Sequence, residues 1–403
     1  MKAKPRIAVV SPFLDKRHGT ERCVAEQIER LAQDYEIHVY STSIQDVDLS
    51  EITCHHIPRL PGPHLASYLW FLMANHLRRW WDRRFRGLDY DLVFTPGINC
   101  LDADIIAVHI VFAEFYRLAH QELELRRNPA RKWPRLIHRK LTYHLFMALE
   151  RGVYARDEIL LAVTSRKMEQ DLERCFRRKG RMALVYNGVD LEQMNPARRQ
   201  SLREKARRDL RLPERAFAIL LIGNDWKKKG LRCLIEAVGS LGIPELQILV
   251  VGHDESFSYD EILQRNGLEN RMTILPIVPQ VESYYAAADM YAGPSLEDSF
   301  AIPPLEAMAC GLPVIVSRQA GVSELVSHGV DGLVLEDPTD SRQLAELIRR
   351  IYENADLRRE MSARAEATAR QYTWQRNAEE MKKVFEGCLR EKGRDAPAAS
   401  GQS

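Results

Sequence analysis

The sequence has no long hydrophobic run, few cysteines and no excess of charge of one sign. Its apolar runs, such as residues 69–74, are much shorter than the ~20 residues that a membrane-spanning helix needs. The first apolar stretch, residues 6–11, is short and β-branched, which predicts a strand and not a signal peptide. The 58 basic and 56 acidic residues nearly cancel, which argues against a globally basic nucleic-acid binder. The seven cysteines are scattered without a CxxC pair, which predicts reduced, mostly packed thiols in a cytosol.

Strand-like and helix-like segments alternate along all 403 residues, a length that suggests two or three domains at about 150 residues each. Helical spacing is present at 21–31 and 230–239. The alternation predicts an α/β fold with parallel, doubly wound sheets. We expect a first series of strands at 6–11, 35–40, 91–94, 105–108, 159–163 and 182–186, and a second at 217–222, 246–251, 272–275, 290–293, 313–317 and 332–335.

The pattern is interrupted at the turn signal Asn187-Gly188 and by an Arg-rich stretch, residues 196–211. We therefore expect two Rossmann-like domains, at 1–190 and 191–372. A last helix over 373–391, begun by Thr373 as N-cap, is expected to pack back on the first domain. The small, polar tail 392–403 is expected to be disordered.

Ligands of such sheets bind beyond the carboxyl ends of the strands, so the loops that follow strands hold the candidate residues. The loop 223–230 carries three consecutive lysines before a glycine and a helix, which favours a phosphate or diphosphate. A solvated charged turn is the alternative. The loop 294–306 holds Asp298 and Glu306 beside backbone amides, which suits sugar or ribose hydroxyls. Helix capping or solvation of these carboxylates is the alternative.

The string PSLEDSFAIPPLEAMACGLPVI resembles the donor-site signature of the retaining glycosyltransferases of family four, the glycogen-synthase-like group with the GT-B fold. Further segments resemble that family in its order. They are residues 18–22 (HGTER), AVH ending in His109, VYNGVD, NDWKKKG and AGVSELVSHGVDGLV. The resemblance covers about residues 5–390 and is most specific in the second half. It implies a GT-B fold, two Rossmann-like domains facing across a cleft.

The resemblance also implies roles for single residues. His109, Lys229 and Asp298 would be catalytic. Lys229, assisted by Lys227 or Lys228, would neutralise the donor diphosphate, and no metal would be needed. The implied donor-binding residues are Gly19, Asn224, Lys228, Lys229, Val278, Asp298, Ser299, Phe300, Ala301, Ile302 and Glu306.

Within that set, Glu306 would hold the ribose, and Asp298 with the amides of 300–302 would hold the transferred sugar. Gly19 would let the first loop approach the diphosphate, and the backbone near Val278 would meet the base. His109 would lie near the anomeric carbon. Taken alone, His109 would more often be a structural histidine at a strand end. Glu324 stands at an acidic position of the family with a less defined role.

The chain departs from the family pattern at three places. Asp298 replaces the more frequent Glu, with Glu297 beside it. Asn224-Asp225 stands where the family usually has Arg, as in lipopolysaccharide-core glucosyltransferases. His18-Gly19 replaces the usual Gly-Gly. The triplets 46–48 and 102–104 match the DxD metal motif of the other glycosyltransferase fold, but such triplets arise by chance and predict no metal here.

Residues 65–86 mix aromatic side chains with five arginines, and residues 126–140 hold seven basic and no acidic residues. One interpretation is a surface for anionic lipid headgroups or a phosphorylated glycolipid. The other is an ordinary helix with a packed face and a solvated Arg face. Nucleic acid is not indicated, because no fold that recognises it is apparent.

The sequence therefore predicts a retaining, metal-independent transferase without a cofactor. It would move a hexose, of the UDP-glucose type, to a cell-surface glycan or glycolipid such as lipopolysaccharide core. Its place would be the cytoplasm, at the inner face of the membrane. A front-face displacement fits, since no residue stands out as a covalent nucleophile. The alternatives are a nucleotide-sugar epimerase or phosphorylase on the same fold, and a non-catalytic glycan- or membrane-binding scaffold.

Overall fold

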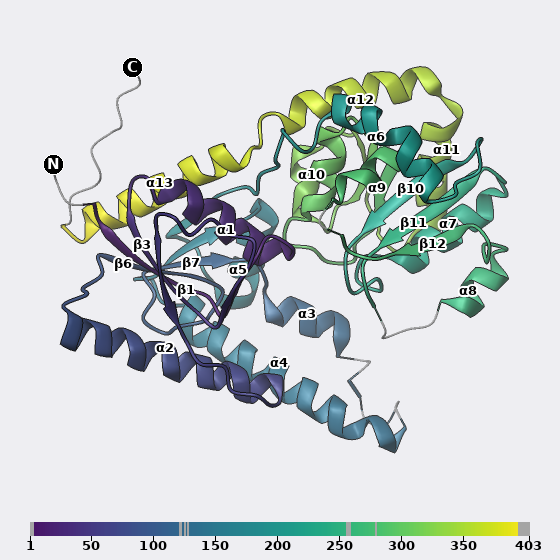
Figure 1. Cartoon of the computed structure of the whole chain (residues 1–403). Helices are drawn as coiled ribbons and strands as arrows, with labels where there is room; N and C mark the ends of the chain where they lie inside the picture. Colours follow the sequence, from purple (N-terminus) through teal and green to yellow (C-terminus); the bar gives the residue numbers. More distant parts are fainter. Residues whose placement is uncertain are drawn as a thin grey trace, which may run out of the picture. The chain divides into compact units, whose positions relative to one another are not determined.

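The computed structural model describes residues 4–120, 123–124, 126, 129–254, 259–278 and 280–393. The chain forms two compact units (Figure 1). Unit 1 consists of Met1–Tyr186 and Asn377–Ser403, and unit 2 of Asn187–Arg376. The sequence placed these boundaries a few residues away, after 190 and after 372. The predicted disordered tail 392–403 falls mainly outside the described residues.

Unit 1 is built on a parallel sheet of seven strands in the order β5-β3-β1-β6-β7-β8-β9. The central strand β1 reads RIAVV and is buried, as expected for a parallel strand covered on both faces. The strands are β1 Arg6–Val10, β3 Glu36–Ser41, β5 Ile52–His56, β6 Leu92–Pro96, β7 Ile105–Val108, β8 Leu160–Val163 and β9 Met182–Leu184; β2 Phe13–Leu14 and β4 Ser43–Ile44 pair separately.

Helices cover both faces of this sheet (Figure 1). One face packs against α1 (Gly19–Leu31) and the second half of α13 (Trp374–Glu391). The other face packs against α2 (His64–Arg86), α4 (Trp133–Tyr154) and α5 (Arg166–Phe176). The short helices α3 (Phe112–Ala119) and η2 (Ala130–Lys132) lie along the chain between β7 and α4.

Unit 2 repeats the plan with a parallel sheet of six strands in the order β12-β11-β10-β13-β14-β15. The strands are β10 Phe217–Ile222, β11 Leu246–Val251, β12 Met272–Leu275, β13 Met290–Gly293, β14 Val314–Ser317 and β15 Leu333–Leu335. One face packs against α7 (Leu231–Leu241), α8 (Asp260–Arg265), α11 (Ser341–Glu353) and α12 (Ala355–Ala369). The remaining helices are α6 (Pro196–Asp209), α9 (Glu282–Ala287), α10 (Ile302–Ala309) and η3 (Gly321–Leu325).

The predicted α/β fold with two doubly wound parallel sheets is confirmed, and three local expectations change. The Arg-rich stretch 196–211, expected as part of a joint, forms α6, which Asn195 caps by accepting from the N–H of Arg198. The strand β5 was not predicted, because its polar sequence ITCHH lacks an apolar pattern. Glu306, expected near the start of its helix, lies in the second turn, since α10 already begins at Ile302.

In the part of the chain that the structure describes, no helix is long and apolar enough to span a bilayer. Within the same residues, no group of three or more His, Cys, Asp or Glu side chains is arranged to hold a metal ion. Most of the cysteines are buried free thiols, and Cys54 is exposed.

Candidate functional site: a lysine and two carboxylates at the switch point of unit 2

The strand order of unit 2 reverses between β10 and its neighbour β13. From β10 the chain builds β11 and β12 outward on one side, then returns to place β13, β14 and β15 on the other. Ligands of open parallel sheets bind beyond the carboxyl ends of the strands at such a reversal. The two loops that follow β10 and β13, residues 223–230 and 294–301, are the loops that the sequence singled out.

Two glycines hold residues 223–230, the lysine loop, in their conformation. Gly223 has φ +147°, and a Cβ added there would lie 2.7 Å from Cε of Lys229, so the lysine stem lies directly on this glycine. Gly230 has φ +76°, and an added Cβ would lie 1.9 Å from the carbonyl oxygen of Pro294. The N–H of Leu296 donates to the carbonyl of Lys228 at 2.7 Å. The two loops are therefore in backbone contact, and only glycine fits at position 230.

Lys229 and Asp298, predicted to hold different parts of a donor, form an ion pair with each other. The exposed fractions of their side chains are 23% and 13%. Such a partly buried pair is screened less than a surface pair. The ammonium of Lys229 and the carboxylate of Asp298 therefore neutralise one another at the point where the strand order reverses.

The turn that carries Asp298 is strained and well anchored. Ala301 has φ +69° and ψ +95°, which L residues other than glycine rarely adopt. The carbonyls of Asp298 and Phe300 accept from the N–H groups of Gly321 at 3.1 Å and Val322 at 2.7 Å. Because residues 303 and 304 are prolines, the first turn of α10 offers few N–H donors of its own. Of the amides of 299–302 that the sequence singled out, the N–H of Phe300 donates to Oδ1 of Asp298 at 3.4 Å.

Glu306 is 3% exposed and accepts from the hydroxyl of Tyr285 at 2.7 Å. Burial, followed by the nearby Glu306, raises the pKa of Tyr285 far above its usual range, so the phenol stays a donor. Tyr285 comes from α9 and so fixes the direction of the Glu306 carboxylate. Ser299 and Phe300 belong to the same loop, and Phe300 is 1% exposed.

The remaining donor-site candidates of unit 2 lie around the lysine loop. Asn224 accepts from the N–H of His253 at 2.9 Å, which ties the loop after β10 to the loop after β11. Lys228 pairs with Asp225 at 2.9 Å, and burial, then the nearby Arg232, lowers the pKa of Lys227. Val278 follows the edge strand β12, and Glu324 is exposed in η3.

Two predicted residues, His109 and Gly19, belong to unit 1. His109 directly follows β7 and is 7% exposed, and among the described residues its Nε2 finds no hydrogen-bond partner. Burial lowers the pKa of His109 to about 4, so the imidazole is neutral at pH 7. Gly19 is the first residue of α1, and the preceding His18 lies 3.0 Å from a carboxylate oxygen of Asp15.

A residue that the sequence did not indicate fixes the chain just after His109. Glu150 of α4 is 1% exposed and accepts from the N–H groups of Phe112 at 2.7 Å and Ala113 at 3.3 Å. It thereby supplies the missing cap of α3, since Val111 makes none. Burial raises the pKa of Glu150 to about 8. The sequence likewise did not indicate that Gly223 supports Lys229 or that Tyr285 directs Glu306. Of these two, only Gly223 carried a local signal, because a glycine directly follows a strand there.

The DxD-like triplets serve the fold of unit 1. Asp102 is held by the two terminal nitrogens of Arg79 at 2.7 and 2.8 Å. Asp104 accepts from the N–H of Val93 at 2.8 Å, and Asp46 pairs with Arg17 at 2.9 Å.

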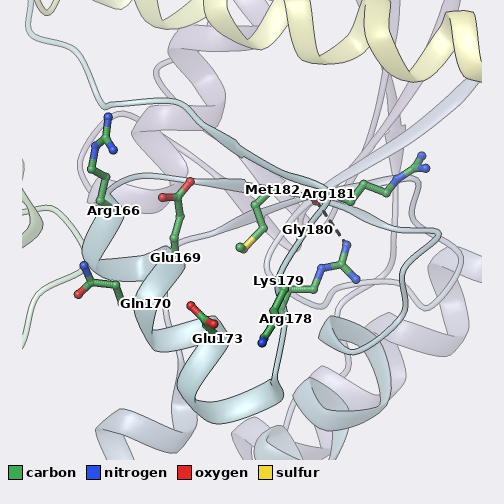
Figure 2. A pocket seen from close by; sticks show the side chains of 9 residues that line it. All are labelled: Arg166, Glu169, Gln170, Glu173, Arg178, Lys179, Gly180, Arg181 and Met182. Carbon is green, nitrogen blue, oxygen red and sulfur yellow. Dashed lines mark hydrogen bonds between the residues drawn. The ribbon is translucent and has the colours of Figure 1, made fainter.

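A pocket of about 570 Å³ lies in unit 1 between α5 and the segment that enters β9 (Figure 2). Its lining mixes both signs of charge, with Glu169 and Glu173 from α5 and Lys179 from the following loop. The guanidinium of Arg178 is turned to backbone carbonyls, among them Ile159 at 2.5 Å and Arg181 at 3.3 Å. None of the predicted site residues lines this pocket.

The surface formed by α2 and the start of α4 is apolar and basic. The outward residues of α2 include Trp80 and Trp81, 53% and 49% exposed, whereas its buried residues include Asn75, Arg79 and Asp82. Of the two interpretations that the sequence left open for residues 65–86, the apolar side chains of the exposed face favour the surface, although Tyr68 and Phe71 are packed inward. Tyr68 and Phe146 join α2 to α4, with ring centroids 4.6 Å apart. The exposed apolar residues are Leu69, Met73, Leu77, Trp80, Trp81 and Phe85 on α2, and Trp133, Ile137 and Leu141 on α4. Residues 127–128 of the predicted stretch 126–140 lie outside the described part.

Comparison with known proteins agrees with this geometry. Residues 17–193 match the model of "Glycosyltransferase Family 4", and residues 203–368 match "Glycosyl transferases group 1". A curated relative, D-inositol 3-phosphate glycosyltransferase of Corynebacterium urealyticum, is 28% identical over 248 residues, 59% of this chain. The chain spans 58% of the length of that relative.

Three solved structures share the fold over nearly the whole chain. Sucrose-phosphate synthase from Thermosynechococcus elongatus has a TM-score of 0.77 at 20% identity and covers 96% of this chain and 100% of its own. WaaG, a glycosyltransferase involved in lipopolysaccharide biosynthesis, has a TM-score of 0.76 at 19% identity. The match covers 95% of this chain and 99% of WaaG. HepE from Anabaena in complex with UDP-glucose has a TM-score of 0.70 at 18% identity. The match covers 95% of this chain and 99% of HepE.

Two doubly wound parallel domains with a switch-point site of this kind define the GT-B fold. The chain belongs to the glycosyltransferases, with a family 4 domain in its first half and a group 1 domain in its second.

Proposed function

We propose that this chain transfers a hexosyl group from a nucleoside diphosphate hexose to an acceptor hydroxyl, with retention of anomeric configuration and without a metal ion. The observation that carries the proposal is Lys229, fixed on Gly223 at the switch point and paired with Asp298. A fixed cation at this place stabilises the charge that develops on a departing diphosphate. It supplies the role that a divalent ion has in other transferases.

In the proposed reaction the donor separates Lys229 from Asp298. The ammonium turns to the diphosphate, and the carboxylate accepts from a hydroxyl of the hexose. The bond between the anomeric carbon and the phosphate oxygen breaks, and the acceptor oxygen bonds to that carbon on the same face. The acceptor proton passes to the leaving phosphate oxygen. Glu306, directed by Tyr285, accepts from the ribose hydroxyls.

The phosphate role is tested with Lys229→Ala, measuring UDP affinity by calorimetry. Loss of a charged hydrogen bond of about 2 kcal/mol predicts roughly thirtyfold weaker UDP binding. Arg232→Ala is the matched control, because this arginine lies on α7 just beyond the loop and pairs with Glu236. Affinity for UDP that survives Lys229→Ala unchanged would refute the assignment. Turnover that is abolished by EDTA and restored by manganese would refute the metal-independent reaction.

We propose UDP-glucose as the donor type and a cell-surface glycan or glycolipid, such as lipopolysaccharide core, as the acceptor. HepE is described in complex with UDP-glucose, and WaaG is described as acting in lipopolysaccharide biosynthesis. A second candidate acceptor is a phosphorylated polyol, favoured by the curated relatives named D-inositol 3-phosphate glycosyltransferase.

Incubation with radiolabelled UDP- and GDP-sugars separates these candidates. Label in a lipid extract supports the glycolipid acceptor, and label in a soluble phosphorylated product with added inositol 3-phosphate supports the polyol. Conversion of the donor to an isomeric nucleotide sugar would identify an epimerase, and phosphate-dependent release of sugar phosphate would identify a phosphorylase. Absence of donor binding in calorimetry would identify a non-catalytic scaffold.

We further propose that the α2–α4 surface binds the anionic headgroups of the cytoplasmic membrane face, where a glycolipid acceptor would be presented. Exposed tryptophans beside arginines are the composition of interfacial helices. The outward arginines include Arg83, with a side chain 66% exposed and paired with Asp89, and Arg86, 53% exposed and 3.4 Å from Asp82. A second copy of the chain is the alternative occupant, and analytical ultracentrifugation distinguishes the two.

A further inference from the structure

The Arg-rich helix α6 is attached to unit 2 mainly by its guanidinium groups. All of α6 lies within the described residues, and Ala206 is the only one of its residues that is buried. Three arginines at every fourth position share one face of the helix, and we call them the arginine ladder: Arg199, Arg203 and Arg207. This face packs along α9 (Figure 1).

The arginine ladder holds the carboxyl end of α9. The last carbonyls of a helix have no partner within the helix, and here guanidinium groups donate to three of them. The contacts are Arg203 to the carbonyls of Ala286 at 3.2 Å and Ala288 at 2.9 Å, Arg207 to that of Ala287 at 3.0 Å, and Arg199 to that of Ala288 at 3.0 Å. A planar guanidinium with several donors can join such acceptors, whereas the single ammonium of a lysine cannot take the same geometry.

The same helix also reaches α10, which carries Glu306. Nη1 of Arg199 donates over 3.5 Å to the carbonyl of Gly311, just beyond the end of α10, while its Nη2 donates to Ala288. A Cβ added to Gly311 would lie 3.3 Å from Cγ of Pro196, so the start of α6 packs on this turn. The ends of α9 and α10 are therefore both held by α6.

The side chains of α9 and α10 meet in the ribose part of the proposed site. Tyr285 of α9 donates to Glu306 of α10 at 2.7 Å, and the two residues are 0% and 3% exposed. Tyr285 lies three residues before Ala288, so the place of its hydroxyl depends on where the end of α9 is held. A binding group must be held to within about 0.5 Å, and a hydrogen bond weakens steeply when its angle changes.

We propose that the arginine ladder positions the carboxylate of Glu306 for the ribose hydroxyls of the donor, acting through α9 and Tyr285. The three arginines are positioning residues, because they act through Tyr285 and do not touch the donor in this proposal. Their role rests on the proposed function of Glu306 as the group that holds the ribose. It gives the Arg-rich segment a task that the proposed reaction leaves open.

A ladder that only stabilises unit 2 is the alternative, and it leads to a different result. A loss of stability lowers the amount of folded protein but affects ligands with and without ribose hydroxyls alike. A loss of positioning weakens only the ligands that Glu306 holds by these hydroxyls. The ratio of two affinities therefore separates positioning from stability.

The test compares the binding of UDP and of 2′,3′-dideoxy-UDP, which lacks both ribose hydroxyls, by calorimetry on the full chain. We expect the wild type to bind UDP about tenfold more tightly or better, because hydrogen bonds to a carboxylate are among the stronger ones. In Arg199→Met and in Arg203→Met the ratio of the two affinities is expected to fall by about fivefold. Each variant leaves the other arginine as a donor to Ala288, so both are expected to fold.

Two further variants of unit 2 complete the comparison. Tyr285→Phe removes the hydroxyl that meets Glu306 without changing the ladder, and it should lower the ratio to a similar extent. Arg208→Met changes an exposed arginine of the same helix and should keep the wild-type ratio. If either ladder variant does not fold, Arg199→Lys takes its place, because lysine keeps the charge but not the fork of donors.

The outcomes separate the ladder from the proposed function. Equal binding of UDP and 2′,3′-dideoxy-UDP by the wild type would refute the ribose role of Glu306 itself. A wild type that discriminates, with ladder variants that discriminate equally well, would overturn the ladder's role alone, even where those variants are less stable. A wild-type ratio in Tyr285→Phe would overturn it too, because the ladder acts through that hydroxyl.

Discussion

At the residue scale, Ala301 shows how tightly the backbone of the loop 294–301 is constrained. Its φ of +69° is a conformation that costs an alanine about 1–3 kcal/mol, and the carbonyls of Asp298 and Phe300 just before it are held by the N–H groups of Gly321 and Val322. Asp225, in the lysine loop, has φ +56° as well. Strain in both loops at the switch point is consistent with a ligand site that is fixed before the ligand arrives.

Replacing Ala301 by Gly is expected to relieve this strain and raise the free energy of unfolding by about 1 kcal/mol, after the entropic cost of glycine. Chemical denaturation measures the change. Ala363→Gly is the control, since Ala363 is exposed inside α12 and its replacement should lower stability by about 1 kcal/mol. A loss of stability at both positions would show that residue 301 is unstrained.

Glu150 gives a pH prediction at the same scale. Its folded pKa of about 8 lies above the unfolded value, so the folded state binds the proton more tightly. Its stabilising contribution is complete below about pH 4 and is lost as pH rises toward 8. Glu150→Gln keeps an acceptor for the N–H of Phe112 without titrating. The variant should therefore gain stability relative to wild type between about pH 5 and 8, on the order of 1 kcal/mol or more. Urea denaturation of the variant and the wild type at about pH 5 and pH 8 measures the difference in their free energies of unfolding. A difference that is the same at both pH values would contradict the prediction.

The places of the candidate residues in the fold were predictable where a motif is local. Lys229 and Asp298 were found because each follows a buried strand inside a dense, specific string. Their pairing was not found, because it joins loops 69 positions apart in the chain. Tyr285 and Glu150 act through contacts between helices, and a single glutamate or tyrosine in a helix carries no sign of its partner.

At the scale of elements, α2 is the helix for which the sequence left two interpretations open. Its periodicity predicts a helix with two unlike faces, but periodicity does not say which face is buried. The inner face keeps Arg79 against Asp102 and Asp82 against His55, while Leu69, Met73, Leu77, Trp81 and Phe85 follow one another at every fourth position outside. Such an outer stripe is characteristic of a surface that binds an apolar partner.

Replacing Trp80 and Trp81 by Ser is expected to weaken binding to anionic vesicles by about tenfold or more, because each indole buries a large apolar area in the interface. Sedimentation with vesicles measures it, and added salt should weaken binding further. Ile274→Ser removes a similarly exposed apolar side chain, 54% exposed, from unit 2 and should leave binding intact. Equal binding by the Trp80/Trp81 variant and wild type would exclude this surface.

At the scale of the whole molecule, the two parallel sheets could be predicted because buried parallel strands are continuous apolar runs bounded by turns. The second unit matches the predicted strands closely, from Phe217–Ile222 to Leu333–Leu335. The polar edge strand β5 and the helix α6 were not predicted. Short polar strands and Arg-rich helices lack the apolar periodicity on which such a prediction depends.

The last helix has a consequence for how the protein is made. Phe385 of α13 is fully buried against Tyr35 and Phe94, with ring centroids 5.6 and 5.4 Å away, so the core of unit 1 is completed by residues that are synthesised after unit 2. Unit 2 is one continuous stretch, Asn187–Arg376, and can fold while it is still being synthesised. Part of the apolar core of unit 1 therefore stays open until α13 has been synthesised, so unit 1 is the part of the chain in which protection by chaperones is expected to matter most.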